Sequence, residues 1–223
     1  MLIIDDFCGI VKENRKIIGK ITAGKMIKNI VFDIGNVLIT FDWDGLARQI
    51  GFTEEDIEVL KVKVIGDRWD EFDRGVMPED EALKYVQEAI PGLEEKFATL
   101  WNRIDEALWV FPYVDSWMSE LKERGYRIYL LSNFPKRLYE KEEKEKFTFI
   151  KYVDGKVISS FIRLIKPDRE IYEYLINQYN LIPEECVFLD DRKKNVDAAK
   201  AIGMQGIVFS SYEEAKKELN ELL

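Results

Sequence analysis

The stretch "NIVFDIGNVLITFDWD", residues 29–44, places an aspartate directly after a run of apolar residues. Ile30–Phe32 is short, continuous and apolar, as expected for a strand that is buried on both faces of a parallel sheet. Asp33 follows this strand, and Gly35 with Asn36 then marks a turn. A carboxylate at this point should lie at the strand-end edge of the sheet, where open α/β folds bind their ligands.

Three further apolar runs have the same character and alternate with helical patterns. The runs lie at 128–131, 187–189 and 207–209, and the helical patterns cover 112–124, 169–180, 193–202 and 212–222. The first helical pattern begins near Pro112 and stops at Gly125, in keeping with the usual places of proline and glycine at helix ends. This alternation predicts an α/β fold with a doubly wound, Rossmann-like parallel sheet.

Residues 45–108 interrupt the alternation of strands and helices. Thr53 and Asp56 have the spacing of a helix N-cap, and "PEDEALKYVQEAIPG", residues 78–92, has a helical pattern. We predict a small helical cap domain at 45–108, inserted into a core domain made of 28–44 and 109–223. Residues 1–27 are expected to form an N-terminal extension of that core.

The composition excludes several classes of function. A net charge of −9 and a pI near 4.9 argue against nucleic acid or an anionic membrane as partner. The chain has no histidine, which removes histidine acid–base catalysis and histidine-ligated metals. Its two cysteines, Cys8 and Cys186, offer neither a disulfide framework nor a zinc cluster. The N-terminus has acidic residues where a secretory signal peptide would have basic ones. We expect a cytoplasmic protein, either a monomer or a homodimer.

Polar side chains gather where the predicted strands end. These are Asp33 after the first strand, Ser132 and Asn133 after the second, Asp190 and Asp191 after the third, and Lys166 just before a helix. Each of them alone is commonly a turn, a helix cap or a solvated surface residue. Because parallel strands end at one edge, the sequence predicts that all of them meet in a single site.

The chemistry of these groups suits the attack of a carboxylate on phosphorus, which requires the negative charge on both partners to be offset. Mg²⁺ prefers oxygen ligands, and the carboxylates of Asp33 and Asp191 would supply them. Lys166 would neutralise the remaining charge. The Ser132 hydroxyl and the Asn133 backbone N–H would bind phosphate oxygens.

The set Asp33, Ser132, Lys166 and Asp190-Asp191 resembles the four motifs of the haloacid dehalogenase-like hydrolase superfamily, over about residues 28–223. The insertion after the first motif resembles the helical cap of that superfamily. The segments "FDIGNVL" and "DEFDRGVMPEDEAL" resemble sequences of the bacterial sugar-phosphate phosphatase branch, which includes α-D-glucose-1-phosphate phosphatase. This resemblance implies a Rossmann-like core with a cap above the strand ends.

The same resemblance implies a role for each site residue. Asp33 is then the nucleophile that forms an aspartyl-phosphate, and Lys166 is both catalytic and substrate-binding. Asp190 is counted with the metal-binding residues, and Asp190 and Asn195 support the metal or Lys166. Asn36, in the turn after the nucleophile, is counted with the substrate-binding residues.

Gly35 departs from the pattern of the superfamily. Many of its phosphatases carry an aspartate two residues after the nucleophile, serving as general acid and then base, whereas Gly35 can only offer its carbonyl oxygen to the metal. A missing acid costs on the order of 10²–10⁴ in rate. Asp42, Asp44 or a metal-bound water are possible substitutes. If none acts, the enzyme should prefer sugar 1-phosphates or activated aryl phosphates, whose leaving groups need little help, over ordinary alkyl phosphates.

The sequence therefore predicts a Mg²⁺-dependent phosphatase of a small phosphorylated metabolite, with a sugar 1-phosphate as the expected example. One alternative is a non-catalytic or very slow binder of phosphorylated metabolites, which the gap at Gly35 favours. A second alternative is a haloacid dehalogenase. Asp190 and Asp191 count against the dehalogenase, because displacing halide needs no metal and the two acids would repel the nucleophile.

Overall fold

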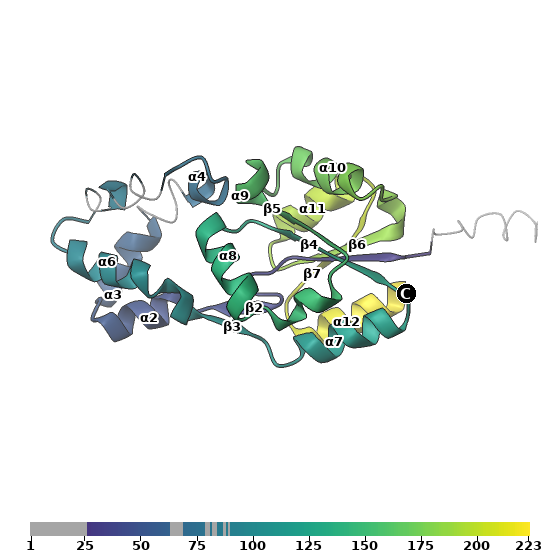
Figure 1. Cartoon of the computed structure of the whole chain (residues 1–223), viewed down its shortest axis with the longest axis horizontal. Coiled ribbons are helices and arrows are strands. Elements are labelled where there is room, and N and C mark those ends of the chain that lie inside the picture. The colour runs from purple at the N-terminus through teal and green to yellow at the C-terminus, as the bar shows by residue number, and fades with distance from the viewer. Residues whose placement is uncertain (1–25, 63–68, 79–80, 82–83, 87, 89) are drawn as a thin grey trace, which may run out of the picture.

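The computed structural model describes residues 26–62, 69–78, 81, 84–86, 88 and 90–223 (Figure 1). Residues 1–25 of the expected N-terminal extension lie outside the described residues, whereas Ile27 is buried against the core. Within the described part, no helix has both the length and the apolar character needed to cross a bilayer.

The core is a five-stranded parallel sheet with the strand order β5-β4-β1-β6-β7. Its strands are β1 (Asn29–Phe32), β4 (Arg127–Ser132), β5 (Gly155–Ile158), β6 (Cys186–Asp190) and β7 (Gln205–Val208). The first strand is central and pairs with β4 on one side and with β6 on the other. The predicted doubly wound parallel sheet is confirmed, and β5 is an edge strand that the sequence pattern did not predict.

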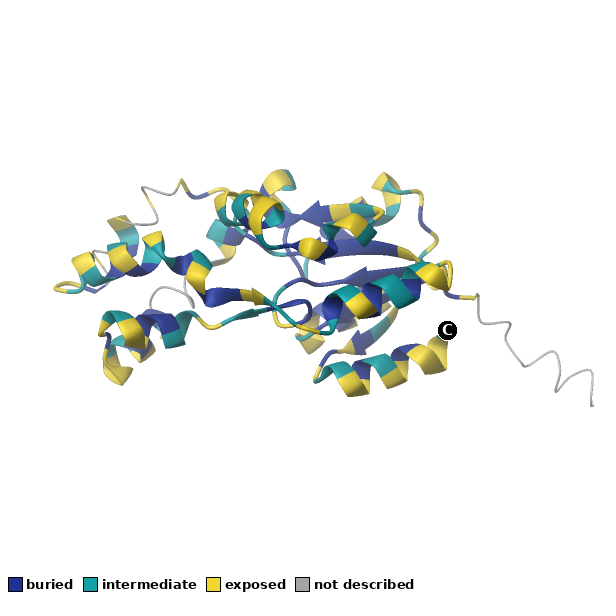
Figure 2. Ribbon diagram, turned by 60° about the horizontal axis from the view of Figure 1, so that its bottom comes forward, coloured by how far each residue is buried: buried dark blue, intermediate teal, exposed yellow. Residues whose placement is uncertain are grey.

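Helices cover both faces of this sheet (Figure 1). They are α7 (Val114–Glu123) and α12 (Tyr212–Leu222) on one face, and α10 (Arg169–Gln178) and α11 (Lys193–Ala201) on the other. The side chains of β1 alternate between these layers, because successive strand residues point to opposite faces. Ile30 and Phe32 pack in the cluster with α7 and α12, and Val31 packs in the cluster with α10. Figure 2 shows the strands as the most deeply buried part of the molecule.

Further helical elements lie between the strands. They are α8 (Lys136–Glu145) and the 3-10 helix η3 (Thr148–Tyr152) between β4 and β5, α9 (Ser159–Ile162) after β5, and the 3-10 helix η4 (Pro183–Glu185) before β6. Both α8 and α9 lie near the carboxyl ends of the strands, on the side that faces the helical segment described next (Figure 1).

A two-stranded antiparallel ribbon leads out of the core to a helical segment. The ribbon pairs β2 (Ile39–Phe41) with β3 (Leu108–Val110). Between them lie α2 (Trp43–Ile50), α3 (Glu54–Leu60), α4 (Trp69–Asp73), α6 (Glu94–Asn102) and the 3-10 helix η2 (Ile104–Ala107). The predicted N-cap at Thr53 is confirmed: its hydroxyl accepts the Asp56 N–H at 3.1 Å, and the Asp56 carboxylate accepts the Thr53 N–H at 2.8 Å.

The helical segment has a hydrophobic cluster of its own, separate from the two clusters that flank the sheet. Leu46, Ile57, Phe97 and Leu100 belong to it, so each helix that contributes turns one face inward. Within the expected helix at 78–92, the described residues 84–86 and 88 are helical. Figure 1 shows this segment beside the edge at which the sheet strands end.

Candidate active site

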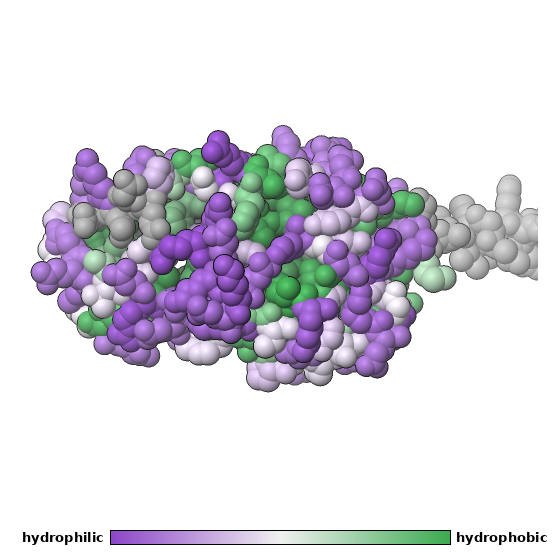
Figure 3. Space-filling view, viewed as in Figure 1, coloured by the Kyte–Doolittle hydropathy of each residue, from purple (hydrophilic) through white to green (hydrophobic). Residues whose placement is uncertain are grey.

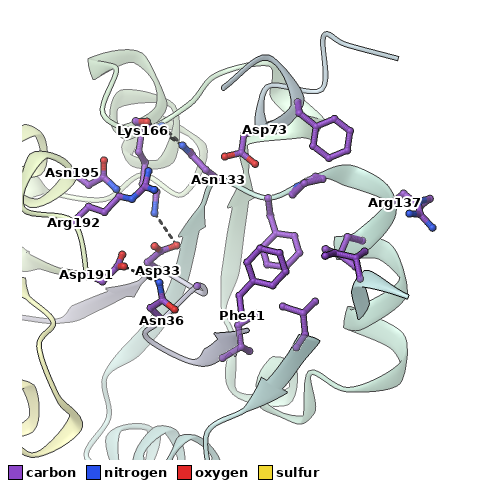
Figure 4. A pocket seen from close by; sticks show the side chains of 18 of the residues that line it. Asp33, Asn36, Phe41, Asp73, Asn133, Arg137, Lys166, Asp191, Arg192 and Asn195 are labelled. Atoms are coloured by element: carbon purple, nitrogen blue, oxygen red, sulfur yellow. Dashed lines mark hydrogen bonds and ion pairs between the residues drawn. The ribbon is translucent and has the colours of Figure 1, made fainter. Parts of the chain in front are cut away.

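Three central strands of the sheet bring the expected site residues to one edge. Ser132 is the last residue of β4, and Asp190 is the last residue of β6. Asp33 follows β1, and its backbone N–H donates to the Leu189 carbonyl of β6 at 2.9 Å. The parallel pairing therefore places the ends of β4, β1 and β6 side by side, and their polar side chains meet there (Figure 4).

Lys166 links two of these strand ends. Its Nζ lies 2.8 Å from Asp33 Oδ1 and 2.7 Å from Asp190 Oδ2, and the residue is 3% exposed. Burial alone would lower the pKa of Lys166, but the charges of Asp33 and Asp190 outweigh it and raise this pKa. Lys166 is therefore held as an ammonium ion beside Asp33, at the place where the sequence expects it.

The two carboxylate oxygens of Asp33 have different surroundings. Oδ1 accepts from the Ser132 hydroxyl at 2.7 Å, from the Ile34 N–H at 2.7 Å and from Lys166. For Oδ2, the described residues provide no hydrogen bond. Burial raises the pKa of Asp33, and Lys166 opposes this rise. One oxygen is thus fixed in place, and the other is available to an electrophile or a cation.

Asp190 is saturated with donors. Its Oδ1 accepts from the Arg192 N–H at 2.8 Å and from Asn195 Nδ2 at 2.9 Å, and its Oδ2 accepts from Lys166 at 2.7 Å and from Asn195 Nδ2 at 3.0 Å. The side chain is fully buried. Of the two supporting roles expected for Asp190 and Asn195, these contacts favour the positioning of Lys166.

Two predicted substrate-binding residues, Asn36 and Asn133, have side chains that contact other site residues. Asn36 Nδ2 donates to Asp191 Oδ2 at 3.0 Å. The Asn133 amide pairs with the backbone of Lys166, accepting its N–H at 2.8 Å and donating to its carbonyl at 3.0 Å. The Ser132 hydroxyl likewise points to Asp33. All three side chains lie in the site, where they orient the residues around them.

The site offers the donors that a hard cation needs. Asp33, Asp190 and Asp191 each have a carboxylate oxygen within 4.8 Å of the others. Asn195 Oδ1 is buried and has no hydrogen-bond partner among the described residues, although Asn195 lines the cleft. An all-oxygen donor set is the one that Mg²⁺ prefers. The residues present therefore fit Mg²⁺.

A cleft separates this edge of the sheet from the helical segment and encloses about 1000 Å³ of space, part of it open to solvent. Its polar end is formed by Asp33, Gly35, Asn36, Asn133, Lys166, Asp191, Arg192 and Asn195. Its other walls are largely apolar and include Phe41, Phe72, Trp101, Ile104, Leu108, Phe134 and Leu138. Figure 4 shows the apolar side chains across the cleft from the carboxylates, whereas the outer surface of α8 and the helical segment in Figure 3 is mainly hydrophilic.

Asp73, the last residue of α4, lines the cleft and is 7% exposed, and it was not predicted from the sequence. Asp42 and Asp44 were predicted instead, and neither of them lines the cleft. Asp42 caps α2 by accepting the Gly45 N–H at 3.0 Å, and Asp44 lies 3.7 Å from Arg48 in an exposed ion pair. No local pattern distinguishes Asp73 from the other acidic residues of this charged segment, because its place depends on how α4 packs.

The fold and the site together define a class. A parallel α/β sheet that gathers a buried aspartate, a lysine and two further acids at its strand ends is typical of a hydrolase with a carboxylate nucleophile. Residues 27–203 match the haloacid dehalogenase-like hydrolases, and the chain belongs to this family. The prediction of the family and of a hydrolase is therefore confirmed.

Among curated proteins, the chain is 27% identical to the sesquiterpene phosphatase astK of Aspergillus oryzae, over 88% of this chain and 96% of that protein. It is 24% identical to the D-ribitol-5-phosphate phosphatase of Bacteroides thetaiotaomicron, over 89% of this chain and 99% of that protein. Both relatives are named as phosphatases, and each matches over nearly its whole length.

Solved structures share the fold. A haloacid dehalogenase-like enzyme from Bacteroides thetaiotaomicron superposes with a TM-score of 0.70 at 22% identity, covering 86% of this chain and 99% of that chain. The same enzyme solved with magnesium and inorganic phosphate gives a TM-score of 0.67 at 21% identity, covering 85% and 98%.

Proposed function

We propose that this protein is a Mg²⁺-dependent phosphatase that hydrolyses a small phosphorylated substrate through an aspartyl-phosphate on Asp33. One observation carries the proposal: three donors fix Asp33 Oδ1, while the described residues leave Oδ2 without a hydrogen bond. The buried ammonium of Lys166 lies 2.8 Å from the same carboxylate. The two phosphatases among the relatives support this chemistry.

In the first step, Asp33 Oδ2 forms a bond to phosphorus, and the bond from phosphorus to the leaving oxygen breaks. Lys166 offsets negative charge on the carboxylate and the phosphoryl group. In the second step, water attacks the phosphorus of the aspartyl-phosphate, which releases phosphate and restores Asp33. Asp190 and Asn195 keep Lys166 in position throughout.

The carboxylates of Asp33 and Asp191 and the carbonyl oxygen of Gly35 would hold Mg²⁺. When bound, the ion would offset the negative charge of the phosphate and its attacking carboxylate. Asn36 donates to Asp191 and keeps its carboxylate turned toward this place. The related fold solved with magnesium and inorganic phosphate supports the proposal.

Residues 45–108 act in this proposal as the cap domain, with 28–44 and 109–223 as the core and 1–27 as an extension. The separate hydrophobic cluster of the helices supports the division, as does the β2–β3 ribbon at the junction. A cytoplasmic location and a monomeric or homodimeric state stay proposals that rest on composition.

The organic part of the substrate would lie against the apolar walls of the cleft. Phe72 and Trp101 meet edge to face there with ring centroids 5.0 Å apart, and Phe41 and Leu108 from the ribbon extend the same surface. Burying an apolar chain against them gains about 25 cal/mol per Å². This favours an isoprenyl or similarly apolar phosphate, and the sesquiterpene phosphatase relative agrees.

A sugar 1-phosphate is the second candidate. Gly35 supports it, because an anomeric oxygen leaves with less help from an acid. The relative named for ribitol 5-phosphate supports a hydrophilic, sugar-like substrate, although that ester is an ordinary alkyl phosphate. The walls of the cleft offer a sugar few polar partners away from the strand ends.

Phosphate release from an isoprenyl monophosphate, a sugar 1-phosphate and p-nitrophenyl phosphate tests the proposal. Release should require Mg²⁺, should stop in EDTA, and should be absent in Asp33→Asn. The isoprenyl ester should give the highest kcat/KM. Full activity in EDTA or in Asp33→Asn would refute the function, whereas a preference for the sugar ester would refute only the apolar substrate class.

A further inference from the structure

Asp73 is a buried carboxylate that the chemistry described above does not use. It is 7% exposed, lines the same cleft as Asp33 and Lys166, and comes from the helical segment instead of the sheet. Across the described residues, its carboxylate makes no hydrogen bond or ion pair. Burying such a group without a partner costs free energy, so its presence at a cleft points to a function. Figure 4 shows it on the wall of the cleft that lies away from Asp191.

Contacts with the core fix the position of Asp73. The Ser159 hydroxyl, on α9, donates to the Asp73 carbonyl at 2.5 Å. One residue further, Arg74 Nη2 lies 2.7 Å from Asp168 Oδ2, two residues after Lys166. Gly75 has a φ of +65°, and a Cβ on it would come within 2.7 Å of the Ser160 carbonyl. The end of α4 is therefore docked on the core, and the Asp73 carboxylate is held over the cleft.

The reaction needs a proton donor that the residues near Asp33 do not provide. Gly35 has no side chain, Asp42 and Asp44 do not line the cleft, and the chain has no histidine. We propose that Asp73 is the general acid of this enzyme and protonates the leaving oxygen of the substrate. This assignment rests on the proposed phosphatase function.

Protons and electrons balance through the cycle. As the bond between phosphorus and the leaving oxygen breaks, its electron pair stays on that oxygen, which takes the proton of Asp73 and departs as an alcohol. The Asp73 carboxylate then takes a proton from the water that attacks the aspartyl-phosphate, so the acid is restored when phosphate leaves.

Burial favours the protonated form of Asp73 up to about neutral pH. Burial raises the pKa of Asp73 to about 7, and Asp70 on the same helix adds to this rise. Arg192 and Lys166 from the core oppose the rise, and Asp33 contributes a smaller increase. A carboxyl with such a pKa can donate and accept a proton at working pH.

Two substrates of similar shape test the assignment. p-Nitrophenyl phosphate leaves as a stable phenolate, whereas p-nitrobenzyl phosphate leaves as a basic alkoxide that needs a proton. kcat/KM reports the steps up to formation of the aspartyl-phosphate, in which the acid acts. Asp73→Asn should lower kcat/KM for the benzyl ester by about 10²–10⁴-fold and change that for the phenyl ester little. Asp44→Asn, in the helical segment but away from the cleft, should largely retain both values.

The pH dependence of the wild type needs no variant. The ratio of kcat/KM for the benzyl ester to that for the phenyl ester cancels the ionisation of Asp33, which both substrates share. This ratio should fall as pH rises through about 7, because Asp73 loses its proton, and it should be flat in Asp73→Asn. The assignment would be overturned if Asp73→Asn lowered kcat/KM equally for both esters, or lowered it for neither. A ratio that does not change with pH in the wild type would also overturn it. If the wild type hydrolyses neither ester, the phosphatase function itself fails.

Discussion

Lys166 contacts two buried carboxylates at once, and the charge balance of the site depends on this side chain. Its Nζ pairs with Asp33 and Asp190, which are themselves almost fully withdrawn from solvent. Desolvation makes an unpaired charge in such a place costly, so removing the lysine should affect folding as well as catalysis. We therefore expect the same groups to determine both the stability of the fold and the proposed chemistry.

Lys166→Met should lower the free energy of unfolding by about 3–5 kcal/mol, because it leaves two buried carboxylates without their cation. Urea denaturation measures this loss. Lys193→Met is the matched control, since Lys193 pairs with Asp197 on the exposed surface of α11 and should change stability by less than about 1 kcal/mol. Equal losses for the two variants would contradict the account of Lys166.

Gly35 lies in the cleft wall, and a Cβ added to it would meet no atom within 4 Å. A side chain at this position therefore has room to enter the cleft that Asp33 also lines. In the Asp73→Asn background, Gly35→Asp should raise kcat/KM for p-nitrobenzyl phosphate and leave p-nitrophenyl phosphate nearly unchanged. No gain for the benzyl ester would show that a carboxyl at position 35 does not reach the leaving oxygen.

Among the elements, the sheet and its polar edge could be predicted from the sequence, because β1, β4 and β6 are continuous apolar runs that end in polar residues. Two elements could not be predicted in this way. β5 has only two buried residues, Val157 and Ile158, and β2 pairs with a strand far along the chain. The residues next to a position in the sequence do not show which distant segment it will pack against. The position of Asp73 also depends on such packing, so it could not be predicted either.

The docking of α4 on α9 can be tested through Gly75. Gly75→Ala places a Cβ against the Ser160 carbonyl and forces a positive φ on alanine, at a cost of roughly 1–2 kcal/mol. Gly92→Ala is the control, since Gly92 also has a positive φ, of +88°, but a Cβ there meets nothing within 4 Å. Thermal denaturation should show both losses.

Only Gly75→Ala should also lower kcat/KM for p-nitrobenzyl phosphate relative to p-nitrophenyl phosphate, because it moves the end of α4 that carries Asp73. If Gly92→Ala alters this ratio to the same extent, the ratio reports general destabilisation, and the contact between α4 and α9 does not position the acid.

In the whole molecule, the sheet and the helical segment contribute different groups to the cleft. In the proposed mechanism, the ends of the parallel strands would supply the nucleophile Asp33 and oxygen ligands for the metal, and Lys166 lies beside them. The helical segment and the ribbon supply most of the apolar surface and one buried acid. The net charge of −9 would repel a negatively charged phosphate ester, so in the proposed function the attraction must come from local groups such as Lys166 and Mg²⁺.

Trapping the phosphorylated protein tests whether Asp33 is the nucleophile. The enzyme is mixed with Mg²⁺ and substrate, quenched in acid within one turnover and digested, and its peptides are analysed by mass spectrometry. We expect one phosphoryl group on the peptide that contains Asp33, and we expect it to be lost in EDTA and absent in Asp33→Asn. Release of phosphate without any protein-bound phosphoryl group, or with that group on another residue, would contradict this role of Asp33.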